Sequence, residues 1–142
     1  MMIKLIFLVV VAYFILPVED TFSKDTWEGV YTDNQAKRGM QLYLENCSEC
    51  HGSQLQGREE APSLKQGAFI YNWDGMPVSI LFQRIRETMP MDDPTSVSRK
   101  IKADILAYIM KENDMPSGNI PLPYQNSKLK RIQWSAQKNS NK

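Results

Sequence analysis

Apolar side chains recur at the spacing of an amphipathic helix in three segments of the chain. The first segment covers residues 33–46, and Asp33 at its start is a candidate N-cap. Its apolar positions are Ala36, Met40, Tyr43 and Leu44. Gly39 lies inside this pattern, where it costs roughly 1 kcal/mol of helix stability relative to alanine. We therefore expect another element to approach the helix closely at Gly39.

The other two helical segments lie further along the chain. One covers residues 78–87 and ends before Pro90, because a residue that precedes proline, here Met89, is driven toward extended backbone. The other covers residues 98–112, with apolar side chains at Ile101, Ile105, Leu106, Tyr108 and Ile109. The stretch 52–74 is glycine-rich and shows little periodicity, so it is predicted to be a loop. This pattern predicts a mainly α fold of three to four helices with long loops, and a large apolar cofactor would complete its core.

The N-terminus has the pattern of an export signal. Lys4 is the only charge in residues 1–18, and the apolar run from Leu5 to Leu16 ends at Pro17. Residues 1–23 are therefore predicted to be either a cleaved signal peptide or a retained membrane anchor. Both alternatives place the remaining chain in the periplasm or on the outer face of the cytoplasmic membrane. We expect one domain over residues 24–116, followed by an extended, proline-containing basic tail over residues 117–142.

Composition excludes several classes of function. The chain has 142 residues, with 17 Lys and Arg against 16 Asp and Glu. Without a basic excess, broad electrostatic binding to nucleic acid is not expected. One histidine and two cysteines cannot form a zinc site of four Cys or His ligands, nor a haem site with two histidine ligands.

All three of these residues lie in one motif, Cys47-Ser48-Glu49-Cys50-His51. The C-x-x-C-H pattern is typical of covalent attachment of c-type haem. Its spacing lets both thiols reach one haem from a single helical turn, and the adjacent imidazole then reaches the iron. A redox-active dithiol or a disulfide would use the same cysteines. Neither alternative explains why the only histidine follows them directly.

With His51 as one axial ligand, the second would come from a methionine. Met1 and Met2 lie in the export segment, whereas Met40 and Met110 lie inside predicted helices. The candidates are then Met76, Met89, Met91 and Met115. Met89 is favoured because it follows a helix in a segment that could fold over the haem, and Met91 is the main alternative.

These residues resemble the class I cytochrome c family, and more narrowly the small exported cytochromes that accompany bacterial quinoprotein dehydrogenases. The resemblance covers roughly residues 27–123. Besides C-x-x-C-H followed by Gly52, it rests on Gly29-Val30-Tyr31-Thr32, Gly39, Tyr43, Ala61-Pro62-Ser63-Leu64, Arg84-Ile85-Arg86-Glu87-Thr88-Met89-Pro90 and Ala103-Asp104-Ile105-Leu106-Ala107-Tyr108-Ile109. The resemblance implies a cytochrome c-like fold around one covalently bound haem c, with Cys47 and Cys50 attached, His51 proximal and Met89 distal.

The resemblance also implies roles outside the motif. The carbonyl of Pro62 would accept the second ring proton of His51, and Gly39 would let the first and last helices cross. Trp73 would either contact a haem propionate or pack in the core. One feature departs from the family pattern, because the last helix begins with Arg99, Lys100 and Lys102 where relatives often carry an acidic residue. These cations would form a solvated face or, with Arg84 and Arg86, a docking surface for an acidic partner.

The sequence predicts a monohaem electron carrier rather than an enzyme. Its expected partners are a periplasmic donor, such as a quinoprotein dehydrogenase, and a downstream terminal oxidase or other cytochrome. It could equally be the haem subunit of a dehydrogenase complex, and its N-terminus could associate with the membrane. The alternative is a haem sensor or peroxidase-like protein with an open sixth coordination site. We expect Lys128, Lys130 and Arg131 in the tail either to contact a partner or membrane, anchored by Leu129, Ile132 and Trp134, or to be solvated.

Overall fold

The computed structural model describes residues 22–59 and 61–138. Residues 1–21 of the predicted export segment, residues 1–23, lie outside the described residues. The elements are, in chain order, β1 (Lys24–Asp25), α1 (Asp33–Asn46), α2 (Ser48–His51), α3 (Gly67–Asn72), α4 (Val78–Thr88), α5 (Arg99–Glu112), α6 (Asn126–Leu129) and β2 (Ile132–Gln133). The mainly α fold predicted from the sequence is therefore confirmed. Within the described ranges, no helix combines the length and apolar character needed to cross a bilayer.

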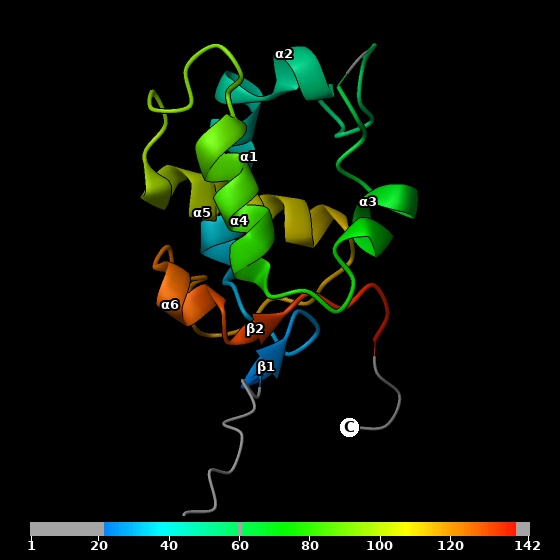
Figure 1. Ribbon diagram of the computed structural model, residues 1–142, viewed down its shortest axis with the longest axis vertical. Coiled ribbons are helices and arrows are strands. Elements are labelled where there is room, and N and C mark those ends of the chain that lie inside the picture. Colours follow the sequence, from blue (N-terminus) through cyan, green and yellow to red (C-terminus); the bar gives the residue numbers. More distant parts are fainter. Residues whose placement is uncertain (1–21, 60, 139–142) are drawn as a thin grey trace, which may run out of the picture.

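The crossing of α1 and α5 forms the centre of the fold (Figure 1). Gly39 makes this crossing possible, because a Cβ at this position would overlap the backbone carbonyl of Asp104 in α5. Nearby, the rings of Tyr43 and Tyr108 pack with centroids 5.4 Å apart. The close approach expected at Gly39 is confirmed.

The ends of α1 and α5 follow from side-chain capping. The Thr32 hydroxyl accepts a hydrogen bond from the Gln35 amide at 3.2 Å and caps α1, so Asp33 is the first helical residue rather than the predicted N-cap. The Ser98 hydroxyl caps α5 in the same way, accepting from the Ile101 amide at 3.3 Å. Each cap satisfies an amide that has no partner within its own helix.

A short helix interrupts the stretch that was predicted to be a loop. This helix, α3, has six residues and lies inside the 52–74 segment. Phe69 is its only buried side chain. Six residues with one buried position show no helical periodicity, which is why the sequence pattern missed this element.

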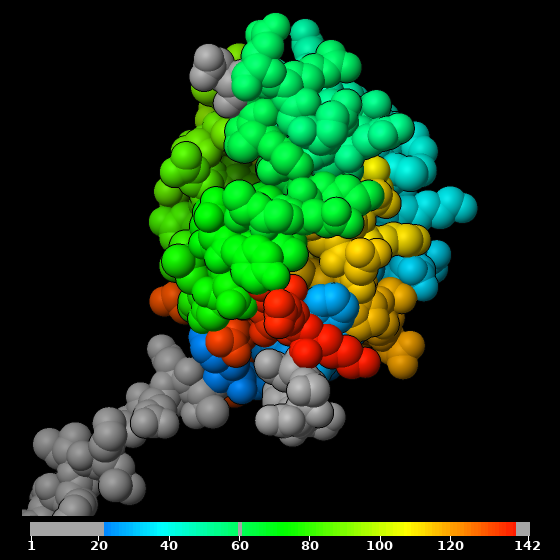
Figure 2. All heavy atoms as spheres, turned by 90° about the vertical axis from the view of Figure 1, so that its right-hand side faces the viewer, coloured from blue at the N-terminus to red at the C-terminus, as the bar shows by residue number. Residues whose placement is uncertain are grey.

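The C-terminal segment also differs from the prediction of an extended tail. Its strand β2 pairs in parallel with β1, and Leu122, Leu129 and Trp134 are buried in the core. The indole of Trp134 donates to the Ile70 carbonyl at 3.0 Å and packs edge-on against the ring of Phe69. Figure 2 shows this segment, in orange and red, between the N-terminal strand and the elements coloured green. Its buried residues are irregularly spaced, so no period revealed them.

Candidate functional site

The C-x-x-C-H motif folds as a single helical turn. Cys47 ends α1 and directly precedes α2, and the His51 amide donates to the Cys47 carbonyl at 3.0 Å. Both cysteines are free thiols, Cys47 partly buried and Cys50 exposed. Burial raises the pKa of the Cys47 thiol to about 11. This turn, α2, lies at one end of the molecule, at the top of Figure 1.

The ring of His51 is held by its Nδ1 atom. Only 8% of this residue is exposed, and Nδ1 lies 2.9 Å from the carbonyl oxygen of Pro62. Because a carbonyl oxygen can only accept, Nδ1 carries the proton, and in the neutral ring Nε2 then keeps its lone pair. Within the described chain the ring makes no other hydrogen bond. Nε2 is therefore the atom with which His51 would bind a metal.

A backbone network holds Pro62 at this position. The amide of Leu64 and the hydroxyl of Ser63 both donate to the Leu55 carbonyl, at 2.9 and 3.0 Å. On the other side of Pro62, Arg58 and Ala61 exchange backbone hydrogen bonds of 3.0 and 2.7 Å. The segment that carries Pro62 is thus tied at both ends to the turn that follows His51.

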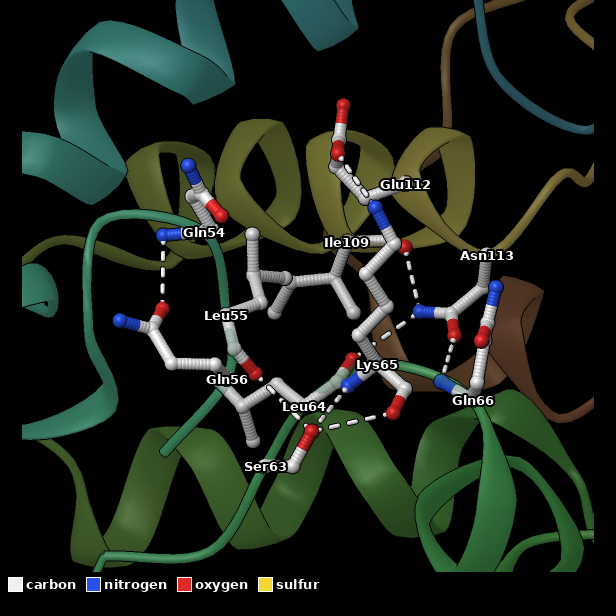
Figure 3. A network of polar contacts seen from close by, with 10 residues as sticks. All are labelled: Gln54, Leu55, Gln56, Ser63, Leu64, Lys65, Gln66, Ile109, Glu112 and Asn113. Atoms are coloured by element: carbon white, nitrogen blue, oxygen red, sulfur yellow. Dashed lines mark hydrogen bonds and ion pairs between the residues drawn. The ribbon is translucent and has the colours of Figure 1, made fainter. Parts of the chain in front are cut away.

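Residues at the end of α5 hold the same segment from the opposite side (Figure 3). The amide nitrogen of the buried Asn113 side chain donates to the Leu64 carbonyl at 3.0 Å, and its oxygen accepts from the Gln66 amide at 2.6 Å. Next to it, Lys65 and Glu112 form an ion pair of 3.1 Å. The sequence indicates Asn113 as a residue that ends the last predicted helix, but it does not reveal the contacts with Leu64 and Gln66.

The turn after His51 depends on Tyr43 and Gly52. The hydroxyl of Tyr43, a fully buried residue, donates to the Gly52 carbonyl at 2.7 Å. Gly52 itself has φ +79°, and a Cβ there would overlap the side chain of Gln56. This left-handed glycine lets the chain reverse toward Pro62 directly after the motif.

The candidate methionines differ sharply in environment. Met89 ends α4 in extended backbone and is partly buried, and its amide donates to the Ile85 carbonyl at 3.1 Å. Met91 is 85% exposed and Met76 is 42% exposed. Met115 is buried near Tyr31, whose hydroxyl donates to its carbonyl. The C-terminal end of α4 lies at the same end of the molecule as α2 (Figure 1).

Trp73 ends α3 and is partly buried against the hydrophobic core. Its carbonyl accepts from the Met76 amide at 3.0 Å. Among the described residues, no hydrogen bond joins its indole to His51, Pro62 or Met89. Both sequence-based alternatives for Trp73 therefore stay open.

The basic start of α5 is not a uniform surface. Arg99 and Lys100 are exposed, whereas Lys102 is only 2% exposed. Lys102 therefore belongs neither to the solvated face nor to the docking surface that the sequence suggested. The signal for its burial was its position, three and four residues before the core residues Ile105 and Leu106.

The donor atoms fit covalently bound haem c. Two free thiols and one imidazole with an available Nε2 lie on one turn, as attachment to a single haem requires. In the described ranges, no group of His, Cys, Asp and Glu side chains is arranged to hold a metal ion without such a cofactor. Helical fold and motif together define a class I c-type cytochrome.

Comparison with known proteins gives the family. The model of the family described as "Cytochrome C oxidase, cbb3-type, subunit III" matches residues 34–109, more than half of the chain. The chain belongs to this family, and its cytochrome c domain is that of an electron carrier. No curated protein sequence matches.

One solved structure is similar in part. It is the sulfane dehydrogenase SoxCD from Paracoccus pantotrophus, with a TM-score of 0.48 and 18% sequence identity. The alignment covers 64% of this chain and 54% of the SoxCD chain, so this chain spans about half the length of that relative.

Proposed function

We propose that the protein carries one haem c and transfers single electrons between redox proteins. Thioether bonds from Cys47 and Cys50 would hold the haem, and His51 Nε2 would be the proximal ligand. When bound, haem supplies the one-electron ferric and ferrous couple. The observation that carries the proposal is the 2.9 Å contact between His51 Nδ1 and the Pro62 carbonyl, since this contact fixes the ring with Nε2 available.

The same contact assigns a role to Pro62. A hydrogen bond from the second ring nitrogen orients an axial histidine and raises its basicity. Asn113 supports this arrangement by holding Leu64, two residues after Pro62. The chain thus determines the direction of the imidazole through the backbone of the 61–66 segment.

Met89 is the distal ligand in this proposal. It is partly buried at the end of α4, whereas the side chain of Met91 projects into solvent and is 85% exposed. Thioether and neutral imidazole both suit ferrous iron and give a high reduction potential. Trp73 would contact a haem propionate or pack beside the cofactor.

The location and partners follow from the same proposal. Export by residues 1–23 places the domain in the periplasm or on the outer face of the cytoplasmic membrane. A retained anchor would join the domain at β1, which lies at the opposite end of the molecule from α2 (Figure 1). Electrons would come from a periplasmic dehydrogenase and pass to an oxidase or another cytochrome. The family description, which names an oxidase subunit, supports an oxidase as acceptor.

Extraction of the purified haem-loaded protein with acidified acetone tests covalent attachment. We expect the pigment to stay with the precipitated polypeptide, because thioether bonds survive denaturation. The Cys47→Ala and Cys50→Ala variants should each yield less haem-loaded protein. Haem in the solvent fraction from the unmodified protein would contradict the proposal.

A further inference from the structure

Lys102 is a buried cation in α5 whose hydrogen-bond partners lie in other segments of the chain. Its side chain is among the largest that are fully buried in the described residues, with 2% exposure. Its Nζ atom donates to the Arg86 carbonyl at 3.1 Å and to the Pro94 carbonyl at 2.6 Å. Burying an ammonium group is costly unless such partners compensate for lost hydration. The two carbonyls therefore compensate for the hydration that the buried ammonium group of Lys102 loses.

The Arg86 carbonyl has no partner within its own helix. It lies in the last turn of α4, and the residue four positions later, which would normally donate to it, is Pro90. Proline has no N–H group, so this carbonyl needs a donor from elsewhere. The Lys102 ammonium supplies that donor from α5.

The second carbonyl lies beyond Met89. Pro94 is in the turn that follows α4, where Asp93 accepts hydrogen bonds from the amide and hydroxyl of Thr95 at 2.8 and 2.6 Å. The ammonium group thus joins the chain before Met89 to the chain after it. The Lys102 side chain therefore holds both ends of the segment between these two carbonyls, residues 87–93.

We propose that Lys102 is a positioning residue, which keeps Met89 on the iron by holding the 87–93 segment closed. This inference rests on the proposed function, because it takes Met89 as the distal ligand. An apolar side chain would fill the same volume in the core, but it would leave both carbonyls without a donor. The segment would then open more easily and Met89 would leave the iron more often.

The charges around Lys102 agree with this role. Arg86, Asp93 and the Cys47 thiol are the titratable groups that act on it. Burial lowers the pKa of Lys102 and the Arg86 guanidinium lowers it further, while the Asp93 carboxylate favours its charged form. Cys47 would have no ionisable thiol once it is bound to haem. Asp93, which precedes Pro94 in the turn after α4, therefore helps to keep the ammonium group of Lys102 protonated and able to donate.

Binding of imidazole to the ferric haem-loaded protein measures how often Met89 leaves the iron. We expect Lys102→Met to bind imidazole about 10- to 100-fold more tightly, since hydrogen bonds to charged groups contribute roughly 1.5–3 kcal/mol. Lys100→Met is the matched control, because it removes the same charge from an exposed position two residues earlier. Its imidazole affinity should stay within about twofold of the unmodified protein, as expected for an exposed site. Equal affinities in the two variants would overturn the proposal.

Amine labelling tests the same claim in the unmodified protein, and so covers the case in which Lys102→Met does not fold. Acetylation followed by mass spectrometry should show Lys102 protected and Lys100 reactive. Saturating imidazole should raise the labelling rate of Lys102 several-fold and leave that of Lys100 unchanged, since opening of the segment and release of Met89 are coupled. A Lys102 rate that does not respond to imidazole would overturn the role.

Met89→Ala separates this inference from the proposed function. If Met89 is the distal ligand, this variant loses its low-spin spectrum and binds imidazole with no competing ligand. If its spectrum is unchanged, then the assignment of the distal ligand fails and the proposal for Lys102 fails with it. A changed Met89→Ala spectrum together with unresponsive Lys102 refutes only the positioning role.

Discussion

At the scale of single residues, the site depends on groups that act through backbone atoms. Pro62 offers its carbonyl to His51, Tyr43 donates to the Gly52 carbonyl, and Asn113 holds Leu64 and Gln66. A carbonyl oxygen is present in every residue type, so the residue at position 62 matters through where its backbone lies. The side chains that fix that backbone are therefore the ones to test by substitution.

Asn113→Ala should destabilise the haem-loaded protein by about 1–3 kcal/mol, because it removes a buried side chain that pairs with the partly buried carbonyl of Leu64 and amide of Gln66. Denaturation with guanidinium, followed by far-UV circular dichroism, measures the change. Lys111→Ala is the control, since its exposed side chain in the same helical turn makes only a long, solvent-exposed ion pair with Asp33, at 3.7 Å, and its loss should cost about 0.5 kcal/mol or less. Equal midpoints for the two variants would refute the structural role given to Asn113.

At the scale of elements, the long helices could be predicted and the short ones could not. The segments 33–46, 78–87 and 98–112 each agree with the structure to within a residue at either end, because each buries a continuous face. Helices α3 and α6 have six and four residues and too few buried positions to show a period. Their positions are determined by contacts with distant parts of the chain, as when Trp134 packs on Phe69.

The candidate site shows the same division. Cys47, Cys50 and His51 could be proposed as haem-binding residues from a local spacing, and Met89 because it follows a helix and precedes Pro90. The burial of Lys102 and the contacts of Asn113 depend on carbonyls in other segments, which no local pattern reveals. The sequence therefore predicts candidate haem-binding side chains, but it does not predict the residues that position them.

At the scale of the whole molecule, the C-terminal segment is part of the folded domain. It pairs with β1, covers α3 and buries Leu129, Ile132 and Trp134. These three side chains are therefore not available to anchor the segment to a partner or a membrane, as the sequence had suggested. Lys128, Lys130 and Arg131 are exposed around them and keep their charges in solvent.

Truncation after Pro123 should consequently destabilise the fold, rather than merely change its surface charge. Removing Leu129 and Trp134 from the core should cost roughly 5 kcal/mol or more, since a large buried side chain alone contributes about 3–5 kcal/mol. Guanidinium denaturation of the haem-loaded protein measures this loss. Such a loss is comparable to the total stability of many small domains.

Replacing Lys128, Lys130 and Arg131 together with glutamine is the control for the truncation. It removes three of the five basic side chains that the truncation removes, and it leaves the buried side chains and backbone pairing in place, so its midpoint should be close to that of the unmodified protein. A truncated protein that unfolds at an unchanged guanidinium concentration would show that the segment contributes nothing to the fold.

The most direct test of the central claim, a haem ligated by His51 and Met89, is the absorption spectrum of the oxidised protein and two variants. A weak sulfur-to-iron band near the red end of the visible range marks methionine ligation. The account predicts this band in the unmodified protein and in Met91→Ala, and its loss in Met89→Ala together with a high-spin spectrum. A band that survives in Met89→Ala, or that is absent from the unmodified protein, would contradict the account.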